Sequence, residues 1–140
     1  SSKVYLNKNS IFKYPSTFSE KERVVSLDGE AFFEIRHNGS PFIITCNNTR
    51  TKVLGTSFNV NGYSNKDGVE VEVITGKVEF SSEENASQKI ILNFNEKGTI
   101  NNETGSIEKS KSSKNSNWWK AGKTELKIKK ILNKIKRKIK

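Results

Sequence analysis

The segment from Val24 to Val78 alternates apolar and polar residues in short runs that are separated by Gly, Pro and Asn. A period of two is typical of strands that bury one face, and the separating residues favour turns. The runs read VSLDGEAFFEI, PFIIT, KVLGTSFNV and VEVEVITGKV. With the flanking segments, about nine or ten short strands are predicted. The sequence therefore predicts an all-β body, either an antiparallel sandwich of short strands or a β-solenoid-like stack.

One face of these strands is expected to form the core, because its residues alternate correctly for one-sided burial. Truncating one of them, as in Phe33→Ala, should cost about 3–5 kcal/mol. The predicted core face comprises Val25, Leu27, Phe33, Ile35, Phe42, Ile44, Leu54, Phe58, Val71, Val73 and Val78.

Three glycines interrupt these runs and are interpreted as structural. Asp28-Gly29 and Thr75-Gly76 are predicted to be tight turns, and Gly55 is predicted to lie at a bulge or at a close backbone approach within one strand. At least two of the three are expected to have a positive φ or to lie at a bulge, because glycine reaches such backbone angles without steric cost.

The charge is divided unevenly along the chain and indicates an appendage. Residues 1–108 hold 12 Lys and Arg against 14 Asp and Glu, whereas residues 109–140 hold 13 against one. We interpret 1–108 as the β-domain, 109–122 as a linker and 123–140 as a basic amphipathic helical tail, or the start of a truncated second domain. The proposed apolar stripe of the tail is Leu126, Ile128, Ile131, Leu132, Ile135 and Ile139.

Two expectations concern this tail. Its helix should form only where the stripe docks, since short isolated helices are marginal in water. The β-domain should stay folded without it, because the strand pattern is complete before Ser110. The absence of an initiating Met suggests a fragment of a longer protein.

No set of catalytic residues can be assembled convincingly from the sequence. His37 is the only histidine and lies in a predicted turn, while Cys46, the only cysteine, ends an apolar run. Glu70 and Glu72 share one strand face, which we interpret as a solvent-exposed face rather than an acid–base pair. We therefore predict no enzymatic activity, no metal and no organic cofactor. The near-neutral body gives no support for nucleic-acid binding.

The quoted runs resemble the FecR family. The resemblance rests on Gly29-Glu30-Ala31-Phe32-Phe33-Glu34, on Pro41-Phe42-Ile43-Ile44-Thr45, on the run from Val53 to Val60, and on the alternating strand from Val69 to Val78. It covers roughly residues 4 to 108, and the combination of motifs is specific.

Two positions depart from the family pattern. Phe94 stands before Asn95-Glu96, where the family usually has Pro. Trp119-Lys120-Ala121-Gly122 resembles the segment that leads, in many relatives, to a small α/β domain, which these few remaining residues cannot complete.

The resemblance implies the periplasmic signal-relay domain of a transmembrane anti-sigma factor of the inner membrane. The implied partners are an outer-membrane TonB-dependent transducer and, through a cytoplasmic region absent from this chain, an extracytoplasmic-function sigma factor. Trp118 and Trp119 are weak candidates for partner binding, and anchoring of the chain to the β-body is the favoured interpretation of both. The alternatives are a carbohydrate- or ligand-binding β-module that uses Tyr63 and the two Trp, and a membrane- or nucleic-acid-binding role for the tail.

Overall fold

The computed structural model describes residues 2–85, 87–112, 118 and 124–127 of the chain. Within these ranges the fold is all-β, as predicted, and its strands form one continuous hydrogen-bonded sheet. The strands are β1 (Lys3–Leu6), β2 (Ile11–Lys13), β3 (Arg23–Ile35), β4 (Phe42–Cys46), β5 (Thr49–Val53), β6 (Thr56–Gly62), β7 (Gly68–Thr75), β8 (Val78–Ser82), β9 (Lys89–Leu92), β10 (Glu96–Asn101), β11 (Ile107–Lys111) and β12 (Thr124–Lys127).

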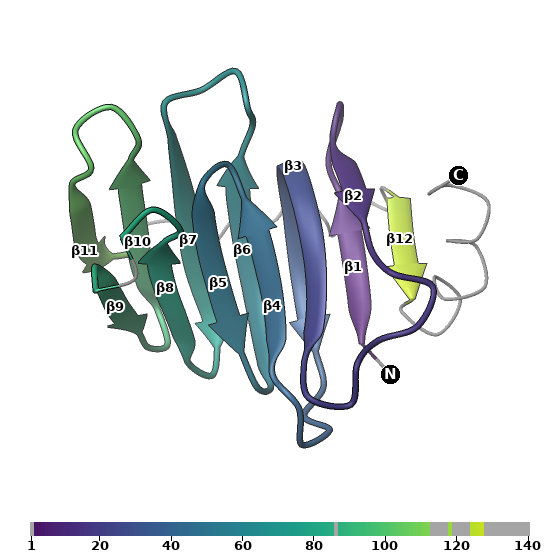
Figure 1. Cartoon of the computed structure of the whole chain (residues 1–140). Helices are drawn as coiled ribbons and strands as arrows, with labels where there is room; N and C mark the ends of the chain where they lie inside the picture. Colours follow the sequence, from purple (N-terminus) through teal and green to yellow (C-terminus); the bar gives the residue numbers. More distant parts are fainter. Residues whose placement is uncertain (1, 86, 113–117, 119–123, 128–140) are drawn as a thin grey trace.

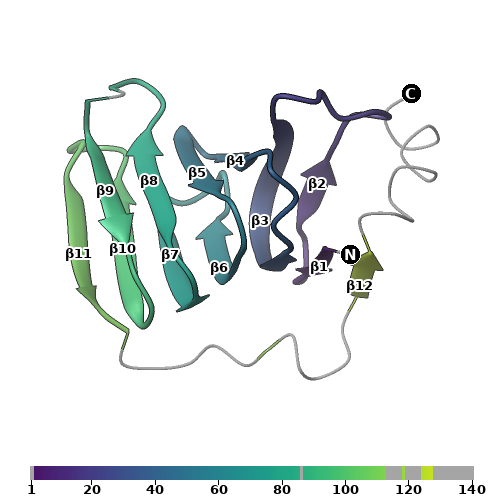
Figure 2. The same cartoon turned by 90° about the horizontal axis from the view of Figure 1, so that it is seen from below.

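The sheet folds over itself into two layers, which Figure 2 shows edge-on. We name the layer in the order β11-β10-β7-β6-β3-β1-β12 sheet A, and the layer in the order β2-β3-β4-β5-β8-β9 sheet B. The long strand β3 belongs to both layers at one side, and β9 approaches β10 and β11 at the other (Figure 1). Neighbouring strands are antiparallel except β3 and β4, which are parallel. The molecule is thus a nearly closed sandwich.

β3 changes sheets at Gly29. Its first half pairs with β2 and β4, and its second half, from Gly29 onward, pairs with β6. Gly29 has φ +134°, and a Cβ there would collide with Ser10. The Ser10 hydroxyl accepts a hydrogen bond from Glu30 N at 2.9 Å and donates one to Glu30 O at 3.1 Å. The predicted Asp28-Gly29 turn is therefore wrong: the glycine permits a change of layer inside one continuous strand, not a reversal.

The core between the layers is largely the predicted one. Phe33 is fully buried and stacks on Phe58 with ring centroids 5.1 Å apart. Of the predicted core residues only Leu54 is wrong, since half of its surface is exposed. β5 ends at Val53 and β6 begins at Thr56, so Leu54 lies in the connection between strands of opposite sheets, where alternation no longer applies.

A tight turn and a further strand follow Cys46, so that the predicted run KVLGTSFNV is divided between two strands, β5 and β6. Asn47 and Asn48 have φ of 42° and 64° and connect paired residues Cys46 and Thr49. Two successive residues with positive φ form the tight hairpin turn that matches strand twist, and Asn tolerates it. β5 begins directly after this turn. Gly76, at the predicted turn between β7 and β8, has φ +82°, whereas Gly55 lies outside the positive region.

The C-terminal part departs from the predicted domain division. β11 runs to Lys111, into the proposed linker, and Thr124–Lys127 form β12 on the edge of β1 rather than the start of a helix. The strand pattern is therefore not complete before Ser110. The remaining stripe residues of the proposed helix lie outside the described residues. In the part of the chain that the structure describes, no helix has the length and apolar character needed to cross a bilayer.

Candidate partner-binding surfaces

The residues considered for catalysis do not form a site. His37 is exposed beyond the end of β3, whereas Cys46 ends β4 and is paired with Leu27 in the first half of β3. The Cys46 thiol is buried and donates to Gly62 O at 3.3 Å. Burial, with a smaller contribution from Asp28, raises the pKa of Cys46 to about 12, so the thiol stays protonated and weakly nucleophilic at neutral pH. Among the residues described, no group of three or more potential metal ligands occurs.

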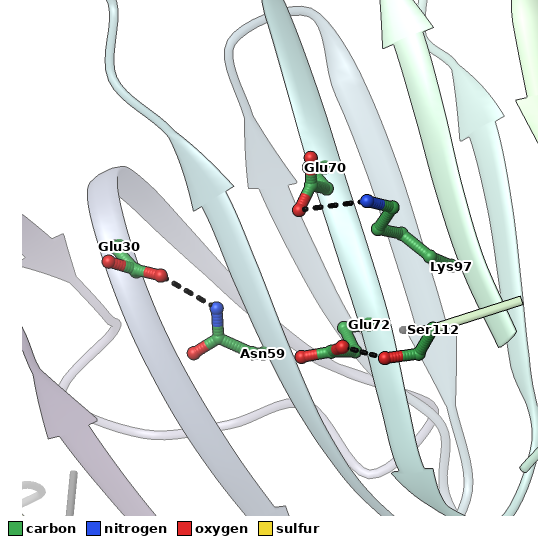
Figure 3. Close-up of polar contacts among 6 residues, drawn as sticks. All are labelled: Glu30, Asn59, Glu70, Glu72, Lys97 and Ser112. Carbon is green, nitrogen blue, oxygen red and sulfur yellow. Dashed lines mark hydrogen bonds and ion pairs between the residues drawn. The ribbon is translucent and has the colours of Figure 1, made fainter. Parts of the chain in front are cut away.

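Glu70 and Glu72 share the outer face of sheet A but differ in environment (Figure 3). Glu70 is exposed and lies 3.8 Å from Lys97 Nζ. Glu72 is only 8% exposed, and its carboxylate accepts a hydrogen bond from the Ser112 hydroxyl. The prediction that both face solvent is wrong for Glu72, because Ser112, which directly follows β11, contacts it.

A polar network occupies the middle of the same face. Asn59 on β6 is 5% exposed, and its Nδ2 donates to Glu30 Oε2 at 2.8 Å (Figure 3). The other oxygen of Glu30 accepts from Asn7 Nδ2, also at 2.8 Å. On its outer side, Asn59 Oδ1 accepts a hydrogen bond from the Trp118 indole N–H at 3.0 Å. Four side chains from separate segments are thereby linked in one series.

Trp118 therefore contacts the β-body, in agreement with the favoured interpretation that this residue anchors the chain. Trp119 lies outside the described residues. Asn59 and Ser112 were not singled out from the sequence. The only sequence signal for Asn59 is an amide within the run SFNV, and in a strand with one exposed face such a residue is ordinarily taken as solvated.

An in-register row explains how sheet A buries its outer face. Phe32 pairs with Tyr5 on one side and with Asn59 on the other, and Asn59 pairs with Glu72. The Tyr5 and Phe32 rings lie 6.1 Å apart, and Phe32 is 3% exposed although it points away from the core. This face is thus apolar near β1 and acidic and hydrogen-bonded toward β7.

The outer face of sheet B has a different character. A row across five strands is formed by Val24, Ile43, Lys52, Glu79 and Ile91, each paired with the next. Val24 and Ile91 are each 38% exposed. The first four residues of the row line an open depression of about 500 Å³ that extends toward Arg50 and Lys89. Exposed apolar groups mixed with both signs of charge suit contact with another protein.

The fold places this chain in the class of all-β sandwich domains. The model of the FecR family, described as "FecR protein", matches residues 1–79, more than half of the chain. Two crystal structures of a proposed anti-sigma factor from Parabacteroides distasonis ATCC 8503, at 1.65 and 2.50 Å resolution, are similar to this chain with 38% identity and a TM-score of 0.71. The similarity covers 79% of this chain and 51% of that protein. Among curated protein sequences, none matches this chain.

The chain belongs to the FecR family. It spans about half the length of the similar protein of known structure.

Proposed function

We propose that this chain is the periplasmic signal-relay domain of an inner-membrane anti-sigma factor, and that it acts by protein–protein contact rather than by catalysis. The observation that carries the proposal is the family match, together with the 38% identity to a proposed anti-sigma factor over most of this chain. The proposed input is an outer-membrane TonB-dependent transducer. The proposed output is an extracytoplasmic-function sigma factor, reached through a cytoplasmic region outside this chain.

The outer face of sheet B is the surface proposed for contact with the transducer. Val24 and Ile91 offer apolar area at its two sides, and Lys52 and Glu79 provide both charges between them. Ile43 lies beneath them, 1% exposed, so the centre of the row is well packed. Exposed apolar groups on both sides of a pair of opposite charges allow a partner to bury apolar area and to match the charges at the same time.

The experiment is a binding titration between this chain and the periplasmic signalling domain of the transducer encoded with it. Binding should weaken at least about tenfold in Val24→Glu or Ile91→Glu, because a buried unpaired carboxylate opposes association. The matched control is Ile11→Glu, an exposed apolar residue on the edge strand β2. Absence of binding to any such domain would refute the partner, and equal losses in all three variants would refute the surface.

The carbohydrate-binding alternative requires aromatic rings aligned on an open surface. The hydroxyl of Tyr63 donates to Lys8 O at 2.9 Å, and the indole of Trp118 donates to Asn59. Both rings are thus engaged on separate elements, and we do not favour this alternative. Glycan-array binding that Tyr63→Ala abolishes would reinstate it.

A further inference from the structure

The C-terminal part of the chain contacts sheet A at three successive positions. Ser112 donates to Glu72 on β7, Trp118 donates to Asn59 on β6, and β12 pairs with β1 at the edge. The order of these contacts along the chain matches the order of the strands across the sheet. They therefore form one extended line of interaction on the outer face.

The Asn59 amide is oriented to accept a hydrogen bond from whatever covers it. An ionised carboxylate only accepts hydrogen bonds, so the contact with Glu30 Oε2 must use the Asn59 NH₂ group. The amide oxygen is then directed outward, where the Trp118 N–H meets it. Because Asn59 is 5% exposed, leaving this oxygen without a donor would be costly. The position selects a side chain with an N–H group.

The same network reaches the edge at which β12 binds. Glu30 holds Asn7, which comes directly after β1, and the backbone N–H of Asn7 donates to Glu30 O at 3.0 Å. The four residues of β1 pair with β3 on one side and with β12 on the other. The indole site and the β1 edge are therefore joined through Glu30 and are positioned together.

Charge also favours a particular occupant. Glu30, Glu34, Glu70 and Glu72 lie on this face against Lys3 and Lys97, and residues 112–127 contain four Lys and one Glu. A sheet edge that accepts a strand offers main-chain hydrogen bonds to any extended segment, while neighbouring side chains supply the selectivity. Here the selectivity is for positive charge and for an N–H-bearing ring.

We propose that the β1 edge and the Asn59 amide together form a binding site for an extended, lysine-rich segment that carries an indole. Trp118 and β12 fill this site in cis, and a segment of a signalling partner with the same chemistry replaces them in trans. The proposal rests on the proposed function only in taking the trans ligand to belong to a signalling partner. Replacement would release the C-terminal part of the chain from sheet A, so that binding of the partner changes the position of this part relative to the β-body.

The test uses the full chain with Lys3→Cys and Lys127→Cys, which are opposite each other in the β1–β12 register. Oxidation locks β12 in place, and reduction restores exchange in the same protein. The probe is a fluorescently labelled synthetic peptide of residues 112–127, measured by anisotropy. The control carries Lys13→Cys and Ser26→Cys, an exposed cross-strand pair on sheet B that lies outside the surface proposed for the transducer. A native gel without reductant establishes that the lock forms within one chain.

The reduced protein should bind the peptide, and the lock should weaken binding about tenfold or more, because a protein whose competent state is scarce shows a proportionally weaker affinity. Oxidation of the control pair should change nothing. In the full chain, Trp118→Ala should strengthen binding by weakening the cis occupant. A peptide with Phe in place of Trp118 should bind about fivefold more weakly, since it leaves the Asn59 oxygen unpaired.

Equal binding to the locked and reduced proteins, or no binding even to the Trp118→Ala chain, would overturn the proposal. Covalent dimers on oxidation would indicate exchange between copies and would overturn the choice of a signalling partner. If the transducer domain binds the locked and reduced chains equally well, the trans ligand is refuted while the proposed function stands. If the peptide result holds and no transducer domain binds, the cis site stands and the proposed function fails.

Discussion

The two outer faces of this sandwich are built from strands of the same alternating pattern, yet one is covered and the other is open. On sheet A, Phe32 and Asn59 point away from the core and are nevertheless buried. The Phe32 ring packs against Tyr5, and Asn59 accepts a hydrogen bond from Trp118. On sheet B, Val24 and Ile91 occupy comparable positions and remain exposed. The difference shows that burial of an outward-facing residue depends on the side chains that other segments place around it, as well as on the strand that carries it.

The largest effect is expected in the interior that both faces share. Phe33→Ala should lower the free energy of unfolding by about 3–5 kcal/mol, because it removes a fully buried ring stacked on Phe58 and leaves a cavity. Urea denaturation provides the measurement. A loss below about 1 kcal/mol would mean that the layers do not pack as described.

Phe32→Ala and Val24→Ala test whether the outer face of sheet A is covered while that of sheet B is open. If sheet A has a covered outer face, truncating Phe32 should cost about 2–4 kcal/mol, close to a core residue, whereas Val24→Ala should cost less than about 1 kcal/mol. Both are measured by urea denaturation. Similar small costs at the two positions would show that the outer face of sheet A is open in solution.

Asn59→Ala should cost about 1–3 kcal/mol, because it leaves the Glu30 carboxylate and the Trp118 indole without their partner. Its control on sheet B is Ser26→Ala, an exposed position where a change within about 0.5 kcal/mol is expected. Thermal unfolding gives the loss of unfolding free energy in each variant, and the difference between the two losses measures what the hydrogen bonds of Asn59 contribute to stability. Equal losses would contradict the network.

The burial of Cys46 in the interior predicts how the stability of the fold depends on pH. Its folded pKa of about 12 lies above the value of about 8.5 for an exposed thiol. Above pH 8.5 the unfolded chain therefore loses this proton first, and stability should fall by roughly 1.4 kcal/mol per pH unit until the folded pKa is reached. Below pH 8.5 the contribution is fully present.

The measurement compares unfolding of the wild-type protein and of Cys46→Ser between pH 7 and about 10. Other alkaline groups titrate in both proteins, so the informative quantity is the difference between their slopes. Parallel curves would indicate that the thiol is accessible to water.

The smallest effect belongs to the open face. Glu79 and Lys89 lie 3.8 Å apart on sheet B with their side chains partly in solvent. Exposed ion pairs contribute little, so Glu79→Gln should change stability by no more than about 0.5 kcal/mol, and less at high salt. A loss of stability above about 1 kcal/mol would show that the Glu79–Lys89 pair is shielded from water, in conflict with an open outer face of sheet B.

Most of the features that could be predicted followed from the local alternation of apolar and polar residues. Alternation is a property of consecutive residues, so the strands around Phe33, Phe58 and Val71 and their inward faces could be predicted. The exception, Leu54, lies where the chain passes between sheets. Asp28-Gly29 carries the composition of a turn, yet the same positive φ serves a change of layer, and only the pairing of Gly29 with Gly62 distinguishes the two.

The sequence by itself determined the all-β class, the core face and the family, because each depends on residue order over short distances. Tertiary structure alone decided which outward-facing residues are buried. Glu70 and Glu72 are two positions apart on one strand, yet only Glu72 meets the returning Ser112. Likewise Thr124–Lys127 form a strand by pairing with the edge of β1, and such an edge can impose an extended conformation on a segment of weak local preference.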